Sequence, residues 1–399
     1  MPRPRARALA RGARDLSQAR CLARGRADGA RRSARRRDRL PVPAAAGVSR
    51  QAQRARAPRD HGGARRRAAR RAARRPGRAH VGERLRPVPA VRRRPALDLV
   101  LYLRGKLNTG LSRALNAARR GPRVTPPPLE EVIQGGRTPL ALSRLLEGRS
   151  NRERQAAVAR YLGEHRIPFA LQAFGSPVCE NFSVDVGSGE RVLVLVAHHD
   201  AVPGSPGAND NAAAVGILLN LLERLSVSPP TRLRVRFLFT AEEERGYLGA
   251  RYYARAANLE ELAGVLSLEL CGIGDSVAIW DAAEETPFLG RVRSALEGIG
   301  LVRDATYHVV GRIPLFGSDH RAFAPEGVPA YGFTLVPSRE AEALRQFVFS
   351  PMRSAFRHLI HRPVPFDTYH TARDAGATLE PAALALALRA LEAIIAEVT

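Results

Sequence analysis

The sequence has no long apolar run and few cysteines. The apolar stretch at residues 97–103 carries Asp98 and is far shorter than the roughly 20 residues that a helix needs to span a bilayer. The cysteines are Cys21, Cys179 and Cys271, an odd number at unrelated spacings. That pattern argues against a disulfide framework and is typical of a reducing compartment. We therefore expect no membrane span and a cytoplasmic location.

Acidic residues are scarce in only one part of the chain. The 399 residues carry a formal net charge of +26. Residues 1–130 hold 37 of the 64 Lys and Arg but only 7 of the 38 Asp and Glu, whereas residues 131–399 carry a net charge of −4. The charge that would suggest a nucleic-acid or membrane partner therefore belongs to the front segment, and we expect no nucleic-acid partner for the rest.

Residues 1–95 are dominated by Arg, Ala, Pro and Gly. Such a segment buries too little apolar area to offset its ordering entropy, and its like charges repel, so we expect it to be disordered. Three interpretations compete: a basic arm that contacts nucleic acid or anionic lipid, a targeting peptide, or low-complexity sequence without function. The apolar stretch at residues 40–48 contains two prolines and is a poor signal-peptide core, which argues against the targeting peptide. We favour the last interpretation.

The rest of the chain predicts a linker with one short helical piece at residues 96–136 and one catalytic domain at residues 137–399. Residues 191–197 are a short run of branched apolar residues, typical of a central strand covered on both faces. Further strands are predicted at 169–174, 181–186, 233–240, 265–270, 305–310 and 329–335, and helices at 139–146, 152–164, 211–225, 248–257, 287–298, 338–360 and 380–398. Strands that alternate with helices predict an α/β fold, a three-layer αβα sandwich with a mostly parallel (mixed) central sheet.

Side chains of the metal-binding type recur where the predicted elements begin or end. His198 follows the first central strand, the triplet 242–244 (Glu-Glu-Glu) follows the next, and Glu269 stands at the end of the third. Asp210 opens a predicted helix, and His370 lies near the C-terminus. Because ligands of open α/β sheets bind outside the carboxyl ends of the strands, these side chains can converge on one cleft.

These residue types suit zinc chemistry. Imidazole and carboxylate are ligands of Zn²⁺, and a carboxylate such as Asp210 can bridge two ions. Two ions about 3.5–4 Å apart polarise a scissile carbonyl and generate hydroxide from water near neutral pH. A nearby carboxylate that binds no metal can take the proton of the water and pass it to the leaving amine, so neighbouring glutamates can divide the two tasks.

Each motif alone has a simpler explanation. A His-x-Asp at a strand end is often a hydrogen-bonded structural pair, an acidic triplet is usually a solvated turn, and Asp-Asn before a helix is often an N-cap. A single histidine such as His370 is commonly a surface residue. The joint occurrence of these motifs, in this order and each at the end of an element, favours a metal site.

Together the motifs resemble the co-catalytic zinc exopeptidases of metallopeptidase family twenty-eight, over about residues 140–399. Residues 198–200 resemble the family's His-x-Asp, and residues 207–211 resemble its Gly-Ala-x-Asp-Asn. Residues 243–250 resemble its Glu-Glu-x-Gly-x-x-Gly-Ser, with alanine in place of the serine. Residues 318–320 (Ser-Asp-His) and 369–371 (Tyr-His-Thr) resemble two further signatures.

The resemblance implies two zinc ions per chain. The ligands it implies are His198 and Glu269 on one ion, Glu244 and His370 on the other, and Asp210 as the bridge between them. It also selects Glu243 as the general base. The family commonly has aspartate where this chain has Glu269, and the longer side chain is expected to change the spacing of the metals.

Four further residues are candidates for supporting roles. Asp200 is placed to orient a group of the metal site, as carboxylates outside the ligand set often do, and Asn211 follows the bridging residue. The resemblance implies a non-proline cis peptide after Asp210. Asp319 and His320 line the substrate cleft in one interpretation; in the other they are a helix N-cap and a packed histidine.

The function that these residues predict is metal-dependent hydrolysis of a peptide bond, by an exopeptidase or aminopeptidase acting on a peptide substrate. Two alternatives remain: a glutaminyl-cyclase-like acyltransferase with a single zinc, and a non-catalytic binding protein whose basic arm contacts nucleic acid. The presence of both His198 and Asn211 favours two metals. The sequence leaves open the peptide end that is attacked, the preferred side chains and the oligomeric state.

Overall fold

The computed structural model describes residues 83–84, 121, 123–175, 178–314, 316–349 and 362–399. The disorder expected for residues 1–95 and most of the linker expected at 96–136 lie outside these ranges, as does the second half of the helix predicted at 338–360. Two elements inside the predicted front segments are described. Residues Glu83–Arg84 form the short strand β1, and helix α2 (Leu129–Gln134) buries Val132 and Ile133.

A single nine-stranded sheet organises the described residues, in the order β1-β2-β3-β5-β4-β6-β9-β7-β8. After β1 its strands are β2 (Ala170–Phe174), β3 (Cys179–Val186), β4 (Arg191–His198), β5 (Leu233–Thr240), β6 (Leu262–Leu268), β7 (Ser276–Trp280), β8 (Tyr307–Val310) and β9 (Ala330–Val336). Five of the eight strand pairings are parallel, including β5-β4-β6-β9 at the centre. The carboxyl ends of these four strands therefore lie at one edge of the sheet.

Strand β4 shows why the sheet needs cover on both faces. Leu193, Leu195 and Ala197 point into one apolar core, whereas Val194 and Val196 point into another. Successive side chains of a strand alternate between faces, so a continuous apolar run is stable only between two layers of helices. The strand is buried from its second residue to its last, as the sequence predicts for a central strand.

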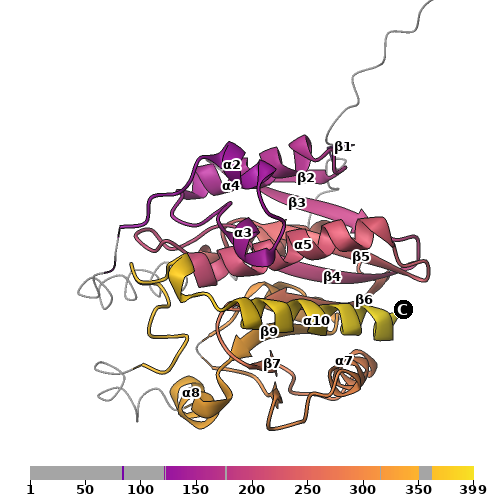
Figure 1. Cartoon of the computed structure of the whole chain (residues 1–399). Helices are drawn as coiled ribbons and strands as arrows, with labels where there is room; N and C mark the ends of the chain where they lie inside the picture. Colours follow the sequence, from indigo (N-terminus) through magenta and orange to yellow (C-terminus); the bar gives the residue numbers. More distant parts are fainter. Residues whose placement is uncertain (1–82, 85–120, 122, 176–177, 315, 350–361) are drawn as a thin grey trace, which may run out of the picture. The chain divides into compact units, whose positions relative to one another are not determined.

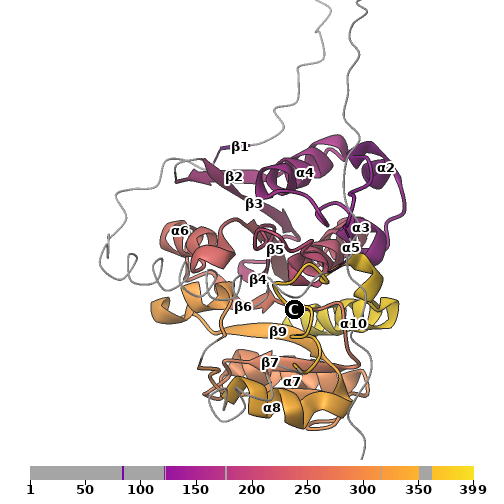
Figure 2. The same cartoon turned by 90° about the vertical axis from the view of Figure 1, so that its left-hand side faces the viewer.

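Helices cover both faces of the sheet (Figures 1 and 2). The larger core is shared with α2, α3 (Pro139–Ser143), α4 (Asn151–Glu164), α5 (Ala213–Val227), α7 (Pro287–Gly298) and α10 (Pro381–Val398). Helix α6 (Leu248–Ala256) packs on the opposite face, and Figure 2 shows it across the sheet from α5 and α10. Helix α8 (Ala341–Phe349) packs through Val348 against Trp280 and Ile313. The predicted three-layer fold with a mixed, mostly parallel sheet is confirmed.

The observed elements differ from the predicted ones in two informative places. Strand β7 was not predicted, because a run of only four apolar residues does not identify its own secondary structure. The helix predicted from residue 211 begins instead at Ala213, since Asp210 and Asn211 have non-helical backbone angles. That irregular segment presents Asp210 to the interior at the edge of the sheet.

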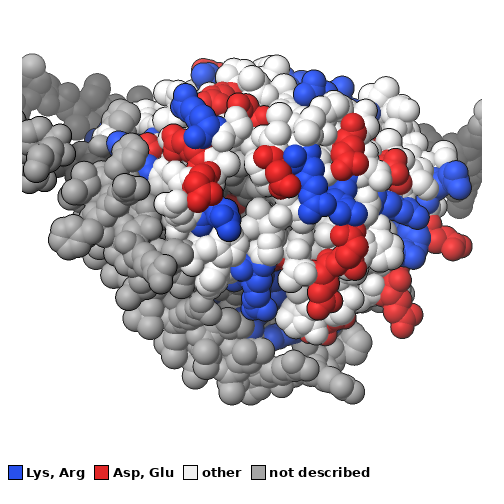
Figure 3. All heavy atoms as spheres, turned by 90° about the horizontal axis from the view of Figure 1, so that it is seen from below, with Lys and Arg blue, Asp and Glu red and all other residues white. Residues whose placement is uncertain are grey.

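The described surface mixes charges of both signs. Figure 3 shows Asp and Glu side chains interspersed with Arg side chains over the face seen from below. This distribution agrees with the small net charge of residues 131–399. Within the described ranges, no helix combines the length and apolar content required to cross a membrane.

Candidate metal centre

The parallel strands deliver the predicted ligands to one edge of the sheet. His198 is the last residue of β4, and Glu269 follows the end of the neighbouring β6. Glu244 lies in the short 3-10 helix that comes soon after β5. Asp210 precedes α5, and His370 comes from the loop before α10. All five side chains are largely withdrawn from solvent, with side-chain exposures of 11% or less.

The five residues form two clusters that share Asp210. Nε2 of His198 lies 3.3 Å from Oδ1 of Asp210 and 3.4 Å from Oε2 of Glu269. Nε2 of His370 lies 3.1 Å from Oδ2 of Asp210 and 3.1 Å from Oε2 of Glu244. Within each cluster the candidate ligand atoms lie within 4.8 Å of one another. The two oxygens of Asp210 thus face different histidines, which is the arrangement that a bridging carboxylate needs.

The donor set fits zinc. Each cluster supplies one imidazole and two carboxylates, three ordinary ligands of an ion that usually takes four. Nδ1 of His198 lies 3.1 Å from the backbone oxygen of Asp200. Because a bond from Nδ1–H to a carbonyl fixes the tautomer, the lone pair of Nε2 is directed at the cluster.

A network of backbone contacts holds Asp210 in place. The carboxylate of Asp374 accepts the backbone N–H of Asn209 at 2.8 Å and that of Asp210 at 3.2 Å. Asn211 is fully buried and donates its side-chain amide to the backbone oxygen of Leu268 at 2.8 Å. The peptide bond between Asp210 and Asn211 is cis, as the family resemblance implies. These contacts connect the candidate bridge to β6 and to the loop that carries His370.

Asp200 links the end of β4 to the glutamates after β5. Its Oδ1 accepts the backbone N–H of Glu243 at 3.0 Å, and its Oδ2 accepts that of Glu244 at 3.2 Å. Oδ1 also lies 3.4 Å from Nδ1 of His198. Asp200 therefore contacts one candidate ligand directly and sets the backbone position of another.

The carboxylate of Glu243 differs from the others at this site. It is buried, it faces a pocket, and among the described residues it has no hydrogen bond or ion pair. Burial raises the pKa of Glu243 well above its usual range, and the neighbouring carboxylates of Glu269 and Glu244 act in the same direction against His198. An uncommitted carboxylate beside the two clusters is available for proton transfer.

The carboxylates of the two clusters are largely buried close to one another, and a bound cation would stabilise their charges. Burial raises the pKa of Glu269 to about 7, and burial also raises that of Glu244, although a histidine opposes the shift in each case.

Ser318 donates a hydrogen bond of 2.8 Å to Oε2 of Glu269 and so orients it. The sequence signature contained Ser318, but nothing in its spacing identified Glu269 as its partner.

Asp319 and His320 lie behind the site. Both are fully buried, and neither lines the pocket. Asp319 accepts a hydrogen bond from the hydroxyl of Thr240 at the end of β5, and Nε2 of His320 lies 3.0 Å from Oδ2 of Asp281. Such contacts are those of residues that support a site from behind. A direct contact of Asp319 or His320 with the substrate stays a prediction.

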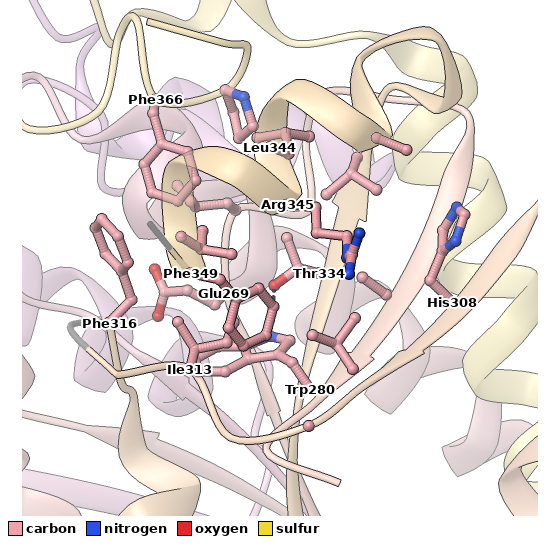
Figure 4. Close-up of a pocket in the computed structure, with 18 of the residues that line it drawn as sticks. Glu269, Trp280, His308, Ile313, Phe316, Thr334, Leu344, Arg345, Phe349 and Phe366 are labelled. Atoms are coloured by element: carbon pink, nitrogen blue, oxygen red, sulfur yellow. Dashed lines mark hydrogen bonds between the residues drawn. The ribbon is translucent and has the colours of Figure 1, made fainter. Parts of the chain in front are cut away.

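A pocket of about 670 Å³ opens beside the clusters (Figure 4). Glu243 and Glu269 lie on its wall, and most of the remaining lining is apolar or aromatic. The labelled lining residues in Figure 4 are Glu269, Trp280, His308, Ile313, Phe316, Thr334, Leu344, Arg345, Phe349 and Phe366. From the sequence, residues 335–366, a stretch rich in Arg and Phe, have two interpretations: a wall of the specificity pocket or a lid, or an amphipathic helix with a basic solvated face, which we favour on the sequence alone. Leu344, Phe349 and Phe366 of that stretch lie on the wall of the pocket.

The chain is similar to known aminopeptidases over short stretches. It is 38% identical over 79 residues to a probable lipoprotein aminopeptidase, LpqL, of Mycobacterium tuberculosis, which covers 20% of this chain and 16% of that protein. It is 34% identical over 95 residues to aminopeptidase YwaD of Bacillus subtilis, which covers 24% of this chain and 20% of that protein. The matches therefore span well under two thirds of either relative.

The fold is also found among solved structures. A glutaminyl cyclase from an Acidobacteriales bacterium superposes with a TM-score of 0.50 at 19% identity, over 70% of this chain and 99% of that one. At this identity the likeness concerns the fold alone. A family model described as peptidase family M28 matches residues 182–395, a range that contains both clusters and Glu243. This chain belongs to peptidase family M28.

Proposed function

We propose that this chain is an aminopeptidase-like hydrolase that cleaves an amide bond at a peptide terminus with two zinc ions. The observation that carries the proposal is the position of Asp210, whose two oxygens face His198 in one cluster and His370 in the other. In this proposal His198 and Glu269 bind one ion, Glu244 and His370 bind the second, and Asp210 binds both. The residue boundaries 1–95, 96–136 and 137–399 are retained as the proposed division of the chain.

Glu243 is the proposed general base. When bound, a pair of zinc ions polarises a carbonyl and lowers the pKa of water into the neutral range. The free carboxylate of Glu243 then accepts the proton of the attacking water and delivers it to the leaving amine. Burial raises the pKa of Glu243 above the usual range of a carboxyl group, which makes its carboxylate a stronger base than an exposed one and supports this role.

The pocket supports a preference for a large apolar side chain at the cleaved terminus. Phe316 and Phe366 lie with ring centroids 4.8 Å apart, and Trp280 donates its indole N–H to the hydroxyl of Thr334 at 2.9 Å. With its polar atom bonded, the tryptophan presents an apolar ring surface to the cavity. Burial of an apolar group against such a wall is favourable in proportion to the area removed from water.

A glutaminyl-cyclase-like activity with one zinc is the second candidate, because the matched solved fold includes such an enzyme. A one-zinc enzyme would leave one of the two clusters without a metal. The presence of a complete second cluster favours the hydrolase.

The alternative of a binding protein depends on a basic arm that lies outside the described ranges, so it stays a prediction. The cytoplasmic location also stays a prediction.

The proposal is tested by measuring zinc and activity on the same purified full-length protein. We expect about two zinc ions per chain by elemental analysis, and hydrolysis of aminoacyl p-nitroanilides with a free amine. Asp210→Asn should lose zinc and activity together. One zinc per chain with cyclisation of N-terminal glutamine would favour the second candidate. Absence of both zinc and hydrolysis would refute the proposal.

A further inference from the structure

Arg154 is a fully buried arginine on helix α4, far from the metal-ligand motifs in the sequence. A guanidinium group stays charged in proteins and carries five N–H donors, so its burial requires acceptors on several sides. Its charge lies close to the carboxylates of Asp374, Asp200 and Asp210, which offset part of the cost of burial.

Three of the four side-chain hydrogen bonds of Arg154 go to backbone carbonyls of the segment between two candidate ligands, and the fourth, from Nε, goes to the backbone oxygen of Arg149 at 3.2 Å. Nη1 donates to the oxygen of His199 at 3.4 Å, and Nη2 donates to the oxygens of Pro206 at 2.6 Å and Gly207 at 3.1 Å. The segment 199–207 connects His198 at the end of β4 to the turn that carries Asp210. One side chain therefore contacts both ends of this segment.

Asn151, one helical turn earlier on α4, holds the middle of the same segment. Its side-chain oxygen accepts the backbone N–H of Ala201 at 3.0 Å, and its side-chain amide donates to the backbone oxygen of Ala201 at 3.1 Å. The first turn of α4 is itself fixed by a capping box between Ser150 and Glu153. A stable helix terminus thus holds the segment at three points.

The segment is shaped to admit the guanidinium. Gly207 has φ 64°, and a Cβ at this residue would lie 2.3 Å from Nη2 of Arg154 and 2.8 Å from the backbone oxygen of Asp210. Only glycine combines this backbone conformation with so close an approach. The contact between Gly207 and Arg154 is therefore a feature of the turn that positions Asp210.

We propose that Arg154, assisted by Asn151, is a positioning residue that sets the spacing of His198 and Asp210 by holding segment 199–207. The inference rests on the proposed two-metal function. Metal ligands depend on the groups that orient them, and loss of such groups typically weakens metal binding or activity about 10- to 100-fold. A merely structural arginine would instead change stability and leave the geometry of the ligands intact.

The test compares four variants of the full chain. Arg154→Met removes the donors and Arg154→Lys keeps the charge without the planar fork, while Asn151→Ala removes the two bonds to Ala201. Arg160→Met is the matched control, because Arg160 lies on the same helix and pairs with Glu130 and Glu164 at the surface. The measurements are zinc affinity by chelator competition, the thermal midpoint of the metal-free protein, and the visible spectrum of the cobalt-substituted protein.

We expect Arg154→Met to weaken zinc binding about 10- to 100-fold and to change the cobalt spectrum, with a smaller effect of the same kind in Asn151→Ala. Arg154→Lys should resemble Arg154→Met, because a lysine cannot reach both ends of the segment. Arg160→Met should match the wild type in zinc affinity and in the cobalt spectrum.

Different outcomes overturn this inference and the function on which it rests. Folded Arg154→Met and Arg154→Lys proteins with wild-type zinc affinity and cobalt spectrum would overturn the positioning role alone. If neither arginine variant folds, an unchanged affinity and spectrum in Asn151→Ala would overturn it. A wild-type chain that binds no zinc would overturn the proposed function and this role with it.

Discussion

The backbone N–H of Glu243 donates to Oδ1 of Asp200 at 3.0 Å, across a gap of 43 residues in the sequence. The other oxygen of the same carboxylate accepts the N–H of Glu244 at 3.2 Å. A candidate base and a candidate ligand are thus positioned by one side chain that itself contacts His198. Changes at Asp200 should therefore affect proton transfer and metal binding together.

Asp200→Asn should lower kcat about 10- to 100-fold, in the range typical of groups that orient metal ligands. An asparagine offers a single acceptor oxygen, so its amide group would face one of the two backbone N–H groups that Asp200 now accepts. Steady-state kinetics and zinc content measure the effect. Asp185→Asn is the control, since the exposed carboxylate of Asp185 pairs with Arg236 on the neighbouring strand β5 and not with a candidate ligand. Equal kinetics in the two variants would contradict the role of Asp200.

Glu243→Gln should keep its zinc and lose turnover by about 10²- to 10⁴-fold, because the amide preserves the shape of the side chain but cannot accept a proton. Elemental analysis and kcat are measured on the same sample. Glu242→Gln is a matched control one residue earlier, where the carboxylate pairs with Arg245 at 2.8 Å. An active Glu243→Gln enzyme would exclude this residue as the base.

Phe366→Ala should reduce kcat/KM for phenylalanyl substrates about 10-fold or more, because lost apolar contact in a specificity pocket costs this much. Phe366 packs against Phe316 and Phe347, with ring centroids 4.8 and 4.7 Å apart. Alanyl substrates, which do not reach this wall, serve as the internal control. A uniform loss on both substrates would indicate a change in fold and would argue against a role in selectivity.

The sequence predicted the elements whose apolar runs have clear limits. Strand β5 (Leu233–Thr240) and helix α7 (Pro287–Gly298) have the predicted bounds, since each is a periodic pattern that begins and ends at turn residues. The candidate ligands could also be predicted, because polar side chains at the ends of apolar strands stand out in the sequence. The aromatic wall of the pocket could be predicted only in part. The Arg- and Phe-rich stretch 335–366 was one signal, but the wall also joins β7 and the loop around Phe316 to that stretch, and no local pattern relates them.

The position of Arg154 in the sequence already indicates that its side chain is buried. On helix α4 it shares a face with Ala157, Val158 and Tyr161, all fully buried, at the spacing expected of one helical stripe. A charged residue on an apolar stripe indicates a buried role, but three of its four hydrogen-bond acceptors are backbone carbonyls more than 40 residues away. Carbonyl groups are present in every residue, so the sequence cannot identify them as the acceptors.

The buried imidazole of His199 should make the metal-free protein less stable as the pH falls from about 6.5 to 4. Its Nε2 lies 3.0 Å from the backbone oxygen of Glu180, and its Nδ1 is buried with no hydrogen-bond partner among the described residues. Burial lowers the pKa of His199 to about 4. The unfolded chain then binds more protons than the folded one between these two pH values.

The free energy of unfolding should therefore decrease over that window by up to about 1.4 kcal/mol per pH unit from this group, with no contribution above about pH 6.5. His199→Phe removes the titrating group and keeps a ring beside Phe182, whose centroid lies 5.8 Å from that of His199. Urea titrations of chelator-treated protein at several pH values should give a shallower dependence for the variant. Parallel curves for the two proteins would show that His199 is protonated as readily in the folded state as in the unfolded one.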